Sequence, residues 1–226
     1  MKPLQRSFFN QPAGELAPAL IGKILVHRVG KTQRRARIVE AEAYVGPHDL
    51  ACHTSKGRTA RTEVMFGPPG HAYVYLIYGM YHMLNIVAGE PGSAVLIRAA
   101  EPLDGWQVNL SGPGRLARGM GITGPDNGVD LTAQRLFLLD DPAGQPNIAS
   151  GPRIGVDYAK HWKDELLRFA DADSAAVSKP RPTLSYQSST TLKHELPSMA
   201  AFRATIGFGR KAERRTIEAL RRDQRY

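Results

Sequence analysis

The clearest pattern along the chain is a period-two alternation of apolar and polar residues between positions 34 and 45, which predicts a β-strand. One face of this strand would be apolar and the other polar, with Val39, Ala41, Ala43 and Val45 on the first face and Ile38, Glu40, Glu42 and Tyr44 on the second. Because burial of unpaired carboxylates is costly, the second face must be wet, paired with cations or functional.

Hydrophobic runs and turn residues predict further elements along the first 180 residues, and together they favour a mixed α/β body. We expect a short helix over 11–21, strands over 23–29 and 34–45 joined by a turn around 30–32, a strand–turn–strand unit over 72–87 centred on Gly79, a strand over 93–100, a helix that begins within 111–115, a strand over 152–156, and helical structure near 163–169.

Composition and charge narrow the class of protein. The 226 residues have an ordinary globular composition, with 42% hydrophobic and 23% charged residues and a net charge of +9. A charge of this size favours polyanionic partners, either nucleic acid or an acidic membrane surface, without choosing between them. Residues 181–226 carry a net charge of +6, which leaves +3 for residues 1–180.

The last segment differs from the rest in composition. Residues 179–197 are rich in Pro, Ser and Thr and indicate a linker or irregular tail, and residues 210–225 indicate a basic helix. This helix is either a solvated, solubilising segment or an additional contact for nucleic acid or a partner. We therefore expect a domain over 1–180 and a basic extension over 181–226.

Several classes of site receive no support. Cys52 is the one cysteine, so an intramolecular disulfide is excluded. The seven histidines show no metal-ligand spacing, and hydrolase, dinucleotide and phosphate-loop fingerprints are absent from the sequence. Without a signal-peptide pattern or a membrane-length apolar run, the sequence predicts a soluble, intracellular protein with no metal or cofactor.

Two features carry candidate chemistry. A carboxylate on the polar face of the 34–45 strand could act as a general base, or Glu40 could be a structural partner of Arg37 or another arginine. Residues 73, 75, 78 and 81 are tyrosines, which could pack a core hairpin or form a surface on which planar groups stack. In the expected strand, Tyr73 and Tyr75 share a face, and Tyr78 points the other way beside Gly79.

Phosphate could bind in two places. The helix start at Ser111-Gly-Pro-Gly-Arg115, with Arg118 one turn later, would present N–H groups and positive charge to an anion. The polar loop 53–62 adds Lys56, Arg58 and Arg61. From the residues alone, a nucleic-acid enzyme and a non-catalytic nucleic-acid binder both remain open.

Longer motifs resemble one family. RIVEAEAYVGPHDLACH at 37–53, MFGPPGHAYVYLIYGMYHMLNI at 65–86, AVLIRAAEP at 94–102, LSGPGRLARGMGI at 110–122 and PRIGVDYAKHWKDELLRFA at 152–170 resemble the alkyladenine (3-methyladenine, N-methylpurine) DNA glycosylases. The resemblance covers roughly residues 8–178 and says nothing of the segment after about 180. It implies an α+β fold, a single compact domain with a curved antiparallel sheet and a protruding β-hairpin.

The resemblance also implies an activity and a catalytic pair. The family flips a damaged purine out of duplex DNA and hydrolyses its N-glycosidic bond. By the match of motifs, Glu42 is the general base that activates a water, Arg98 orients Glu42 and the water, and Glu40 is a supporting carboxylate. With no lysine in the motif block around Glu42, water is expected as the nucleophile, so the enzyme would be monofunctional.

Pocket and DNA contacts follow from the same match. Tyr44 and His53 would form one wall of a base sandwich, Tyr75 the opposite wall, and Asn85 would disfavour the exocyclic amino group of guanine. Tyr78 would be the wedge that fills the place of the flipped base. The residues expected to contact DNA are Tyr78, Arg58, Arg61, Ser111 and Arg115.

We therefore expect a base-excision-repair glycosylase that acts as a monomer on double-stranded DNA containing damaged purines, without a cofactor or a membrane. It would be cytoplasmic and nucleoid-associated in a bacterium, or nuclear in a eukaryote. A non-catalytic lesion-sensing protein on the same scaffold is the alternative. Hydrolysis of free nucleosides is a third possible function.

Overall fold

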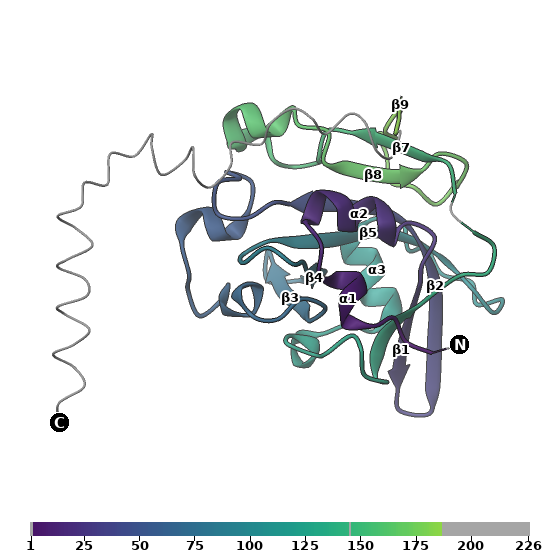
Figure 1. Ribbon diagram of the computed structural model, residues 1–226. Coiled ribbons are helices and arrows are strands. Elements are labelled where there is room, and N and C mark those ends of the chain that lie inside the picture. The colour runs from purple at the N-terminus through teal and green to yellow at the C-terminus, as the bar shows by residue number, and fades with distance from the viewer. Residues whose placement is uncertain (1, 145, 187–226) are drawn as a thin grey trace, which may run out of the picture. The chain divides into compact units, whose positions relative to one another are not determined.

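The computed structural model describes residues 2–144 and 146–186, which form a mixed α and β structure around a nine-stranded antiparallel sheet (Figure 1). The strands are β1 (Ile24–Val29), β2 (Thr32–Tyr44), β3 (Ala72–Ile77), β4 (Tyr81–Val87), β5 (Ala94–Pro102), β6 (Leu136–Leu139), β7 (Ile148–Gly151), β8 (Arg168–Asp171) and β9 (Leu184–Ser185). The α-helices are α1 (Arg6–Phe9), α2 (Ala13–Leu20) and α3 (Pro113–Met120), and 3₁₀ segments lie at His53–Lys56, Glu63–Phe66, Gly124–Asp126 and Asp157–Lys163.

Strand β2 organises the sheet. It pairs along one edge with β5 and along the other with β1 and then β8. The main path through the sheet runs β3-β4-β5-β2-β8-β7-β9, with β6 on the outer side of β1. Because β2 is paired along both of its edges, residues 40–44 lie in the middle of the sheet, between β5 and β8.

Two helices complete the main core. The apolar side of α2 packs on β2, β5 and β8, and α3 packs on β4 and β5. Leu16 and Leu20 of α2 and Leu116 and Met120 of α3 are fully buried and belong to one apolar cluster with the sheet. The position of α3 brings its first residue, Pro113, to the cavity described below.

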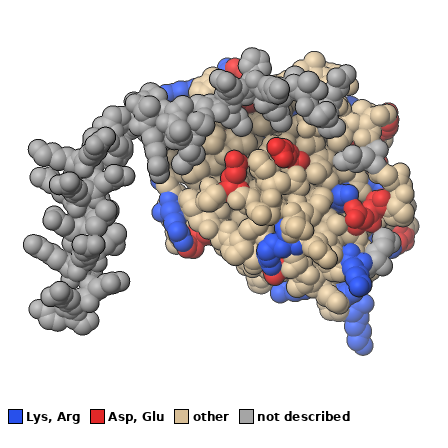
Figure 2. Space-filling view, in the orientation of Figure 1, with Lys and Arg blue, Asp and Glu red and all other residues tan. Residues whose placement is uncertain are grey.

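Most of the elements expected from the sequence are confirmed, together with the antiparallel sheet and the hairpin. The helix expected over 11–21 is α2, the strand pair is β1 and β2, the unit over 72–87 is β3 and β4, and the strand over 93–100 is β5. On the face shown in Figure 2, basic and acidic side chains are interspersed on a mostly uncharged surface.

Two expectations near the end of the domain are wrong. Residues 152–156 are irregular, because the strand β7 ends at Gly151, Pro152 has no N–H to donate to a ladder, and Gly155 has φ of +77°. Helical structure is expected near 163–169, but the 3₁₀ segment Asp157–Lys163 ends where that range begins. Arg168–Asp171 instead form β8, which lies between β2 and β7. Pairing within the sheet outweighs the helical preference of this segment.

A β-bulge in β2 changes the face of the sheet on which the neighbouring side chains lie. The pairing of β2 with β5 shifts register between Ile38 and Glu40 and again between Glu40 and Ala41. As a result Ile38 packs in the main core with Ala41 and Ala43, whereas Val39 packs in a separate cluster with Ala99, Ala170 and Val177. The uninterrupted alternation expected from the sequence is therefore wrong for residues 38 and 39.

The expected tail falls mainly outside the described residues. The basic helix at 210–225 and most of the segment 179–197 lie there. The compact unit reaches Tyr186, since β9 pairs with β7 and the ring of Tyr186 packs edge-to-face on Phe169 with centroids 5.1 Å apart. Within residues 2–144 and 146–186, the helices are too short and too polar to span a bilayer.

Candidate active site

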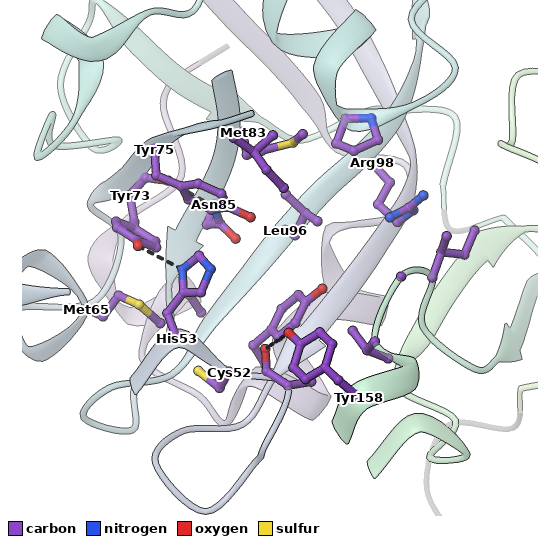
Figure 3. A pocket seen from close by; sticks show the side chains of 18 of the residues that line it. Cys52, His53, Met65, Tyr73, Tyr75, Met83, Asn85, Leu96, Arg98 and Tyr158 are labelled. Atoms are coloured by element: carbon purple, nitrogen blue, oxygen red, sulfur yellow. Dashed lines mark hydrogen bonds between the residues drawn. The ribbon is translucent and has the colours of Figure 1, made fainter. Parts of the chain in front are cut away.

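A cavity of about 270 Å³ opens between the β3–β4 hairpin, β5, the N-terminus of α3 and the segment 154–158. This volume is close to the lower end of ligand pockets, about 300 Å³. Its lining is mostly aromatic and apolar, with a few polar groups. Figure 3 shows Tyr73, Tyr75 and His53 on one side and Arg98 on the other.

The Glu42 carboxylate lies directly behind this wall and is fully buried. Its Oε1 accepts a hydrogen bond from the Ile154 backbone N at 2.8 Å and lies 3.2 Å from Nη1 of Arg98. The Tyr44 hydroxyl donates to Oε2 at 2.9 Å. A carboxylate has about four acceptor positions, so this arrangement leaves one position for a further donor. Tyr44, Arg98 and Ile154 all line the cavity.

Arg98 connects the two glutamates of β2. Its Nε donates to Oε1 of Glu40 at 3.0 Å while Nη1 faces Glu42. Burial lowers the pKa of Arg98, but the adjacent carboxylates of Glu42 and Glu40 outweigh burial and raise that pKa above its ordinary value. The bulge at Glu40 brings both carboxylates onto one guanidinium, and Arg98 therefore provides a permanent positive charge beside Glu42.

Glu40 is enclosed by protein groups. Its carboxylate accepts from Arg98, from Nε of Arg168 at 2.7 Å, and from both the backbone N and the hydroxyl of Ser178 at 2.8 Å. Of the alternatives open from the sequence, pairing with another arginine is confirmed and pairing with Arg37 is wrong, since Arg37 binds Asp141 instead. Of the three possibilities for this strand face, the structure shows pairing with cations, because neither glutamate is exposed and both lie against Arg98.

His53, Tyr73 and Tyr75 form one continuous aromatic surface. The His53 and Tyr75 ring centroids are 4.6 Å apart at 72°, and His53 Nδ1 lies 3.0 Å from the Tyr73 hydroxyl. A planar base between two rings requires about 7 Å, twice the optimal carbon contact. In this structure the His53 and Tyr75 rings contact each other, and the base sandwich expected from the resemblance stays a prediction.

Burial sets the protonation of these groups. Burial, helped by the positive charges of Arg61 and Lys56, lowers the pKa of His53 to about 4, so its imidazole is neutral at pH 7. Burial also raises the pKa of Tyr75, and burial together with Glu42 raises the pKa of Tyr44 well above its ordinary value. The phenol of Tyr44 therefore remains a donor to Glu42.

Tyr44 is supported from behind by a buried arginine. The Arg153 guanidinium lies over the Tyr44 ring at 4.9 Å and forms a two-point ion pair with Asp49. Arg153 also donates to the backbone oxygens of Ala43 and Trp162. This network fixes the segment that carries Ile154, whose N–H binds Glu42.

Asn85 lies on β4 opposite Tyr73 and is almost fully buried at the cavity wall. Its Nδ2 donates to the Tyr73 backbone oxygen at 3.1 Å. This bond fixes the amide and leaves a second N–H for a ligand.

Tyr78 lies at the tip of the β3–β4 hairpin and is 82% exposed. Its φ of +53° is unusual for a residue with a side chain, and Gly79 follows with φ of +69°. Met80 is exposed beside it, and Tyr78 also lines the cavity. The hairpin thus presents an aromatic side chain next to the cavity.

The expected DNA contacts are only partly brought together. Arg61 lies over the Tyr75 ring at 5.0 Å, which places a cation at the aromatic surface. Arg58 lies in the same loop but forms an ion pair with Glu63. Ser111 precedes α3, and Nε of Arg115 donates to the Ser111 backbone oxygen. Arg115 does not line the cavity.

Several residues of the site were not found from the sequence. Ile154, Arg153 and Arg168 bind the glutamates or Tyr44 from more than 100 positions away along the chain, and Tyr158, 69% exposed, lines the cavity from the 3₁₀ segment Asp157–Lys163. The motif at 152–170 is the one signal that could have pointed to them. Among the described residues, no cluster of three or more His, Cys, Asp or Glu side chains could hold a metal ion.

A pocket with aromatic walls, a buried carboxylate–arginine pair and an exposed aromatic hairpin tip fits a protein that handles a planar base. Residues 7–175 match the methylpurine-DNA glycosylase family. The chain belongs to this family.

Curated relatives agree along most of the chain. A protein of Anaeromyxobacter dehalogenans (strain 2CP-C) is 50% identical over 182 residues, which are 79% of this chain and 88% of that protein. A protein of Legionella pneumophila (strain Lens) is 50% identical over 183 residues, 79% of this chain and all of that protein. A Myxococcus xanthus protein is 49% identical over 187 residues, 80% and 96% of the two chains. All three are named "Putative 3-methyladenine DNA glycosylase".

Proposed function

We propose that this protein is a monofunctional DNA glycosylase that takes an alkylated or deaminated purine out of duplex DNA and hydrolyses its N-glycosidic bond with water. One observation carries the proposal: a fully buried Glu42 held by Arg98, Tyr44 and the Ile154 N–H at the wall of an aromatic cavity. Family membership and the names of the relatives support the same reaction and lesion class.

Glu42 is the general base of the proposed reaction. A water bound at the remaining acceptor position of Glu42 transfers a proton to the carboxylate as its oxygen bonds to C1′ of the flipped nucleotide. The C1′–N bond breaks, and its electron pair leaves with the base. The products are the free base and an abasic site in the DNA. Among the described residues that line the cavity there is no lysine, which supports water rather than an amine as the nucleophile.

The walls of the cavity suit a cationic base. Purines alkylated at N3 or N7 carry positive charge, and the faces of Tyr44 and Tyr75 attract cations. The charge also makes such a base a good leaving group, because it departs neutral without a proton donor. The fixed amide of Asn85 supports the proposed discrimination against guanine.

The hairpin tip provides the proposed wedge. Extrusion of a base costs a few kcal/mol of lost stacking, which an inserted side chain can offset. Tyr78 is large, exposed and next to the cavity, so its ring can enter the duplex as the base leaves it. This supports duplex DNA rather than nucleosides outside DNA as the substrate.

Single-turnover excision on short duplexes tests the function. Each duplex carries one 3-methyladenine, 7-methylguanine, hypoxanthine or ethenoadenine, and an undamaged duplex and the corresponding nucleosides are controls. We expect release of at least one damaged base and none from undamaged DNA. Binding to lesion DNA without any release would support the non-catalytic lesion sensor, and faster release from nucleosides would support the third alternative.

A further inference from the structure

A groove of about 500 Å³ outside the catalytic cavity is lined by three arginines, Arg34, Arg115 and Arg118, together with Trp106 and Asn109. Of the described residues that line it, none is an Asp or a Glu. Within the part of the chain that the structure describes, none of the three arginines forms an ion pair with a carboxylate. Nearby Arg35 and Arg37, in contrast, are paired with Asp104 and Asp141.

Two of the arginines are held in place by backbone oxygens, one within α3 and one just before it. Nη1 of Arg34 donates to the Gly119 oxygen at 2.9 Å, near the end of the helix. Nε of Arg115 donates to the Ser111 oxygen, just before the helix begins. Each bond uses one of five guanidinium N–H donors, so most donors remain for a ligand. Guanidinium groups ordered in advance lose less entropy on binding.

The same helix joins this groove to the catalytic cavity. Pro113, the first residue of α3, lines the cavity, and Arg118 lies five residues further along. At 1.5 Å per residue this is about 7.5 Å along the helix. One DNA strand advances about 3.4 Å along the duplex axis per nucleotide, so a groove this near the cavity lies within a few nucleotides of it.

Arg118 also borders the hairpin. It lines a second groove together with Met80 and Tyr81, which lie beside the proposed wedge Tyr78. The arginine groove, the hairpin tip and the cavity are therefore connected through α3 and form a path along which one strand could run.

We propose that the groove of Arg34, Arg115 and Arg118 binds backbone phosphates of the lesion strand, within a few nucleotides of the flipped nucleotide. The inference rests on the proposed function, since it takes the flipped nucleotide as its origin. Guanidinium groups match phosphate geometry and are favoured where such anions bind. The groove adds Arg34 to the phosphate site expected at Arg115 and Arg118.

The test is binding of the full chain to a short duplex with one uncleavable abasic analogue at the lesion position. Arg118→Gln is the main variant, because Arg118 is exposed and its replacement should not disturb the fold. Lys2→Gln, which removes one charge from an exposed lysine remote in sequence, is the matched control. Arg118→Lys keeps the charge.

We expect Arg118→Gln to raise Kd by about tenfold, as for removal of one charge-assisted hydrogen bond, and to make the log–log salt slope shallower by about 0.9. Lys2→Gln and Arg118→Lys should leave the slope near that of the wild type.

A methylphosphonate scan locates the bound phosphates. Replacement of single phosphates along the lesion strand should weaken wild-type binding at one or two positions within a few nucleotides of the lesion. The same replacements should have a smaller effect in Arg118→Gln, in which only Arg34 and Arg115 remain to bind phosphates. The proposal would be overturned if Arg118→Gln had the salt slope and the methylphosphonate pattern of the wild type, or if Lys2→Gln raised Kd as much as Arg118→Gln. An acidic protein segment would then be the alternative occupant of the groove. If excision is normal in that case, only the groove is wrong; absent excision by the wild type would instead remove the proposed function.

Discussion

Glu40 and Glu42 lie two residues apart on β2 and share Arg98, yet their surroundings differ. Protein groups surround Glu40, including Arg168 of the neighbouring strand β8 and Ser178. Glu42 has three such partners, all of which line the cavity. Only Glu42 retains an acceptor position beside the cavity, which supports a catalytic role for Glu42 and a structural role for Glu40.

Glu42→Gln should reduce single-turnover excision by at least about 10²-fold, the usual effect of removing a general base, while binding to lesion DNA remains near normal. The amide oxygen can still accept from Ile154, and the amide nitrogen can donate to the Tyr44 oxygen, so the site should keep its shape. Excision rates and affinity for the abasic duplex, measured on the same preparation, separate the two effects.

Glu40→Gln is the matched control. The amide nitrogen would face donors from Arg168, Arg98 or Ser178, so the free energy of unfolding should fall by about 3–5 kcal/mol, as for a broken buried ion pair. If a folded Glu40→Gln protein is inactive while Glu42→Gln excises at a normal rate, the wrong carboxylate has been assigned as the base.

His53 predicts a pH dependence of stability. Its pKa is lowered to about 4 in the folded protein from an ordinary 6.5, so the unfolded chain binds more protons between these values. The contribution of neutral His53 is therefore complete above pH 6.5 and is lost as pH falls toward 4, by up to about 3 kcal/mol.

Urea unfolding at several pH values checks this contribution. The fall in stability from pH 6.5 to 4 should be smaller in His53→Gln than in the wild type. Parallel curves for the two proteins would show that His53 does not titrate in this range. The comparison uses slopes, because removal of the hydrogen bond to Tyr73 lowers the stability of the variant at every pH.

At the scale of elements, the β3–β4 hairpin has a buried end at the cavity wall and an exposed tip. Tyr73 is buried beneath His53 and Asn85 packs against it, whereas Leu76, Tyr78, Met80 and Tyr81 are exposed around the tip. Exposed apolar side chains of this kind mark a surface for a partner. The hairpin therefore combines a rigid wall of the cavity with a tip suited to enter DNA.

Tyr78→Ala should weaken base flipping more than the chemical step. Because the ring is 82% exposed, its removal should leave thermal stability nearly unchanged, and Tyr78→Phe should behave as the wild type. A fluorescent base analogue beside the lesion reports the flipped population, and unstacking by a few kcal/mol predicts a clear decrease. An undiminished flipped population in Tyr78→Ala would exclude the wedge role.

At the scale of the whole molecule, the compact unit extends past the expected boundary at 180. Leu184 and Ser185 add a short strand to β7, and Tyr186 covers Phe169 on β8. Because β8 pairs with β2 at Glu40 and Glu42, residues 184–186 support the strand that carries the proposed general base.

Removal of residues 187–226 should leave a folded, active enzyme with an unchanged melting temperature. These residues hold nine Lys and Arg against four Asp and Glu, so the salt slope of DNA binding should become shallower by about 0.9 for each phosphate that is no longer neutralised. Thermal unfolding, excision assays and salt titrations measure the three quantities. A large drop in melting temperature would make residues 187–226 structural, and an unchanged slope would show that their charges do not bind DNA.

A longer deletion provides the comparison. Removal of 181–226 also takes away β9 and Tyr186, so we expect it to unfold at a lower temperature than the shorter deletion. Equal melting temperatures for the two proteins would show that β9 contributes nothing to stability.

The sequence by itself determined the elements whose patterns are local. Alternation and turn glycines are enough to predict β1, β2 and the β3–β4 hairpin, because their ladders join neighbours in the chain. The motifs also point to Glu42, Arg98 and the aromatic residues, since a family match carries residue positions directly.

Only the tertiary structure decided how those residues meet. The bulge at Glu40, the ion pairs with Arg98 and Arg168 and the support of Tyr44 by Arg153 join positions more than 50 residues apart. No local pattern encodes such interactions, because their energy comes from partners brought together by the sheet. For the same reason Arg168 lies on a strand rather than on the expected helix. The tertiary structure also decides among the three possibilities for the carboxylate face, since Glu40 and Glu42 are buried and paired with arginines.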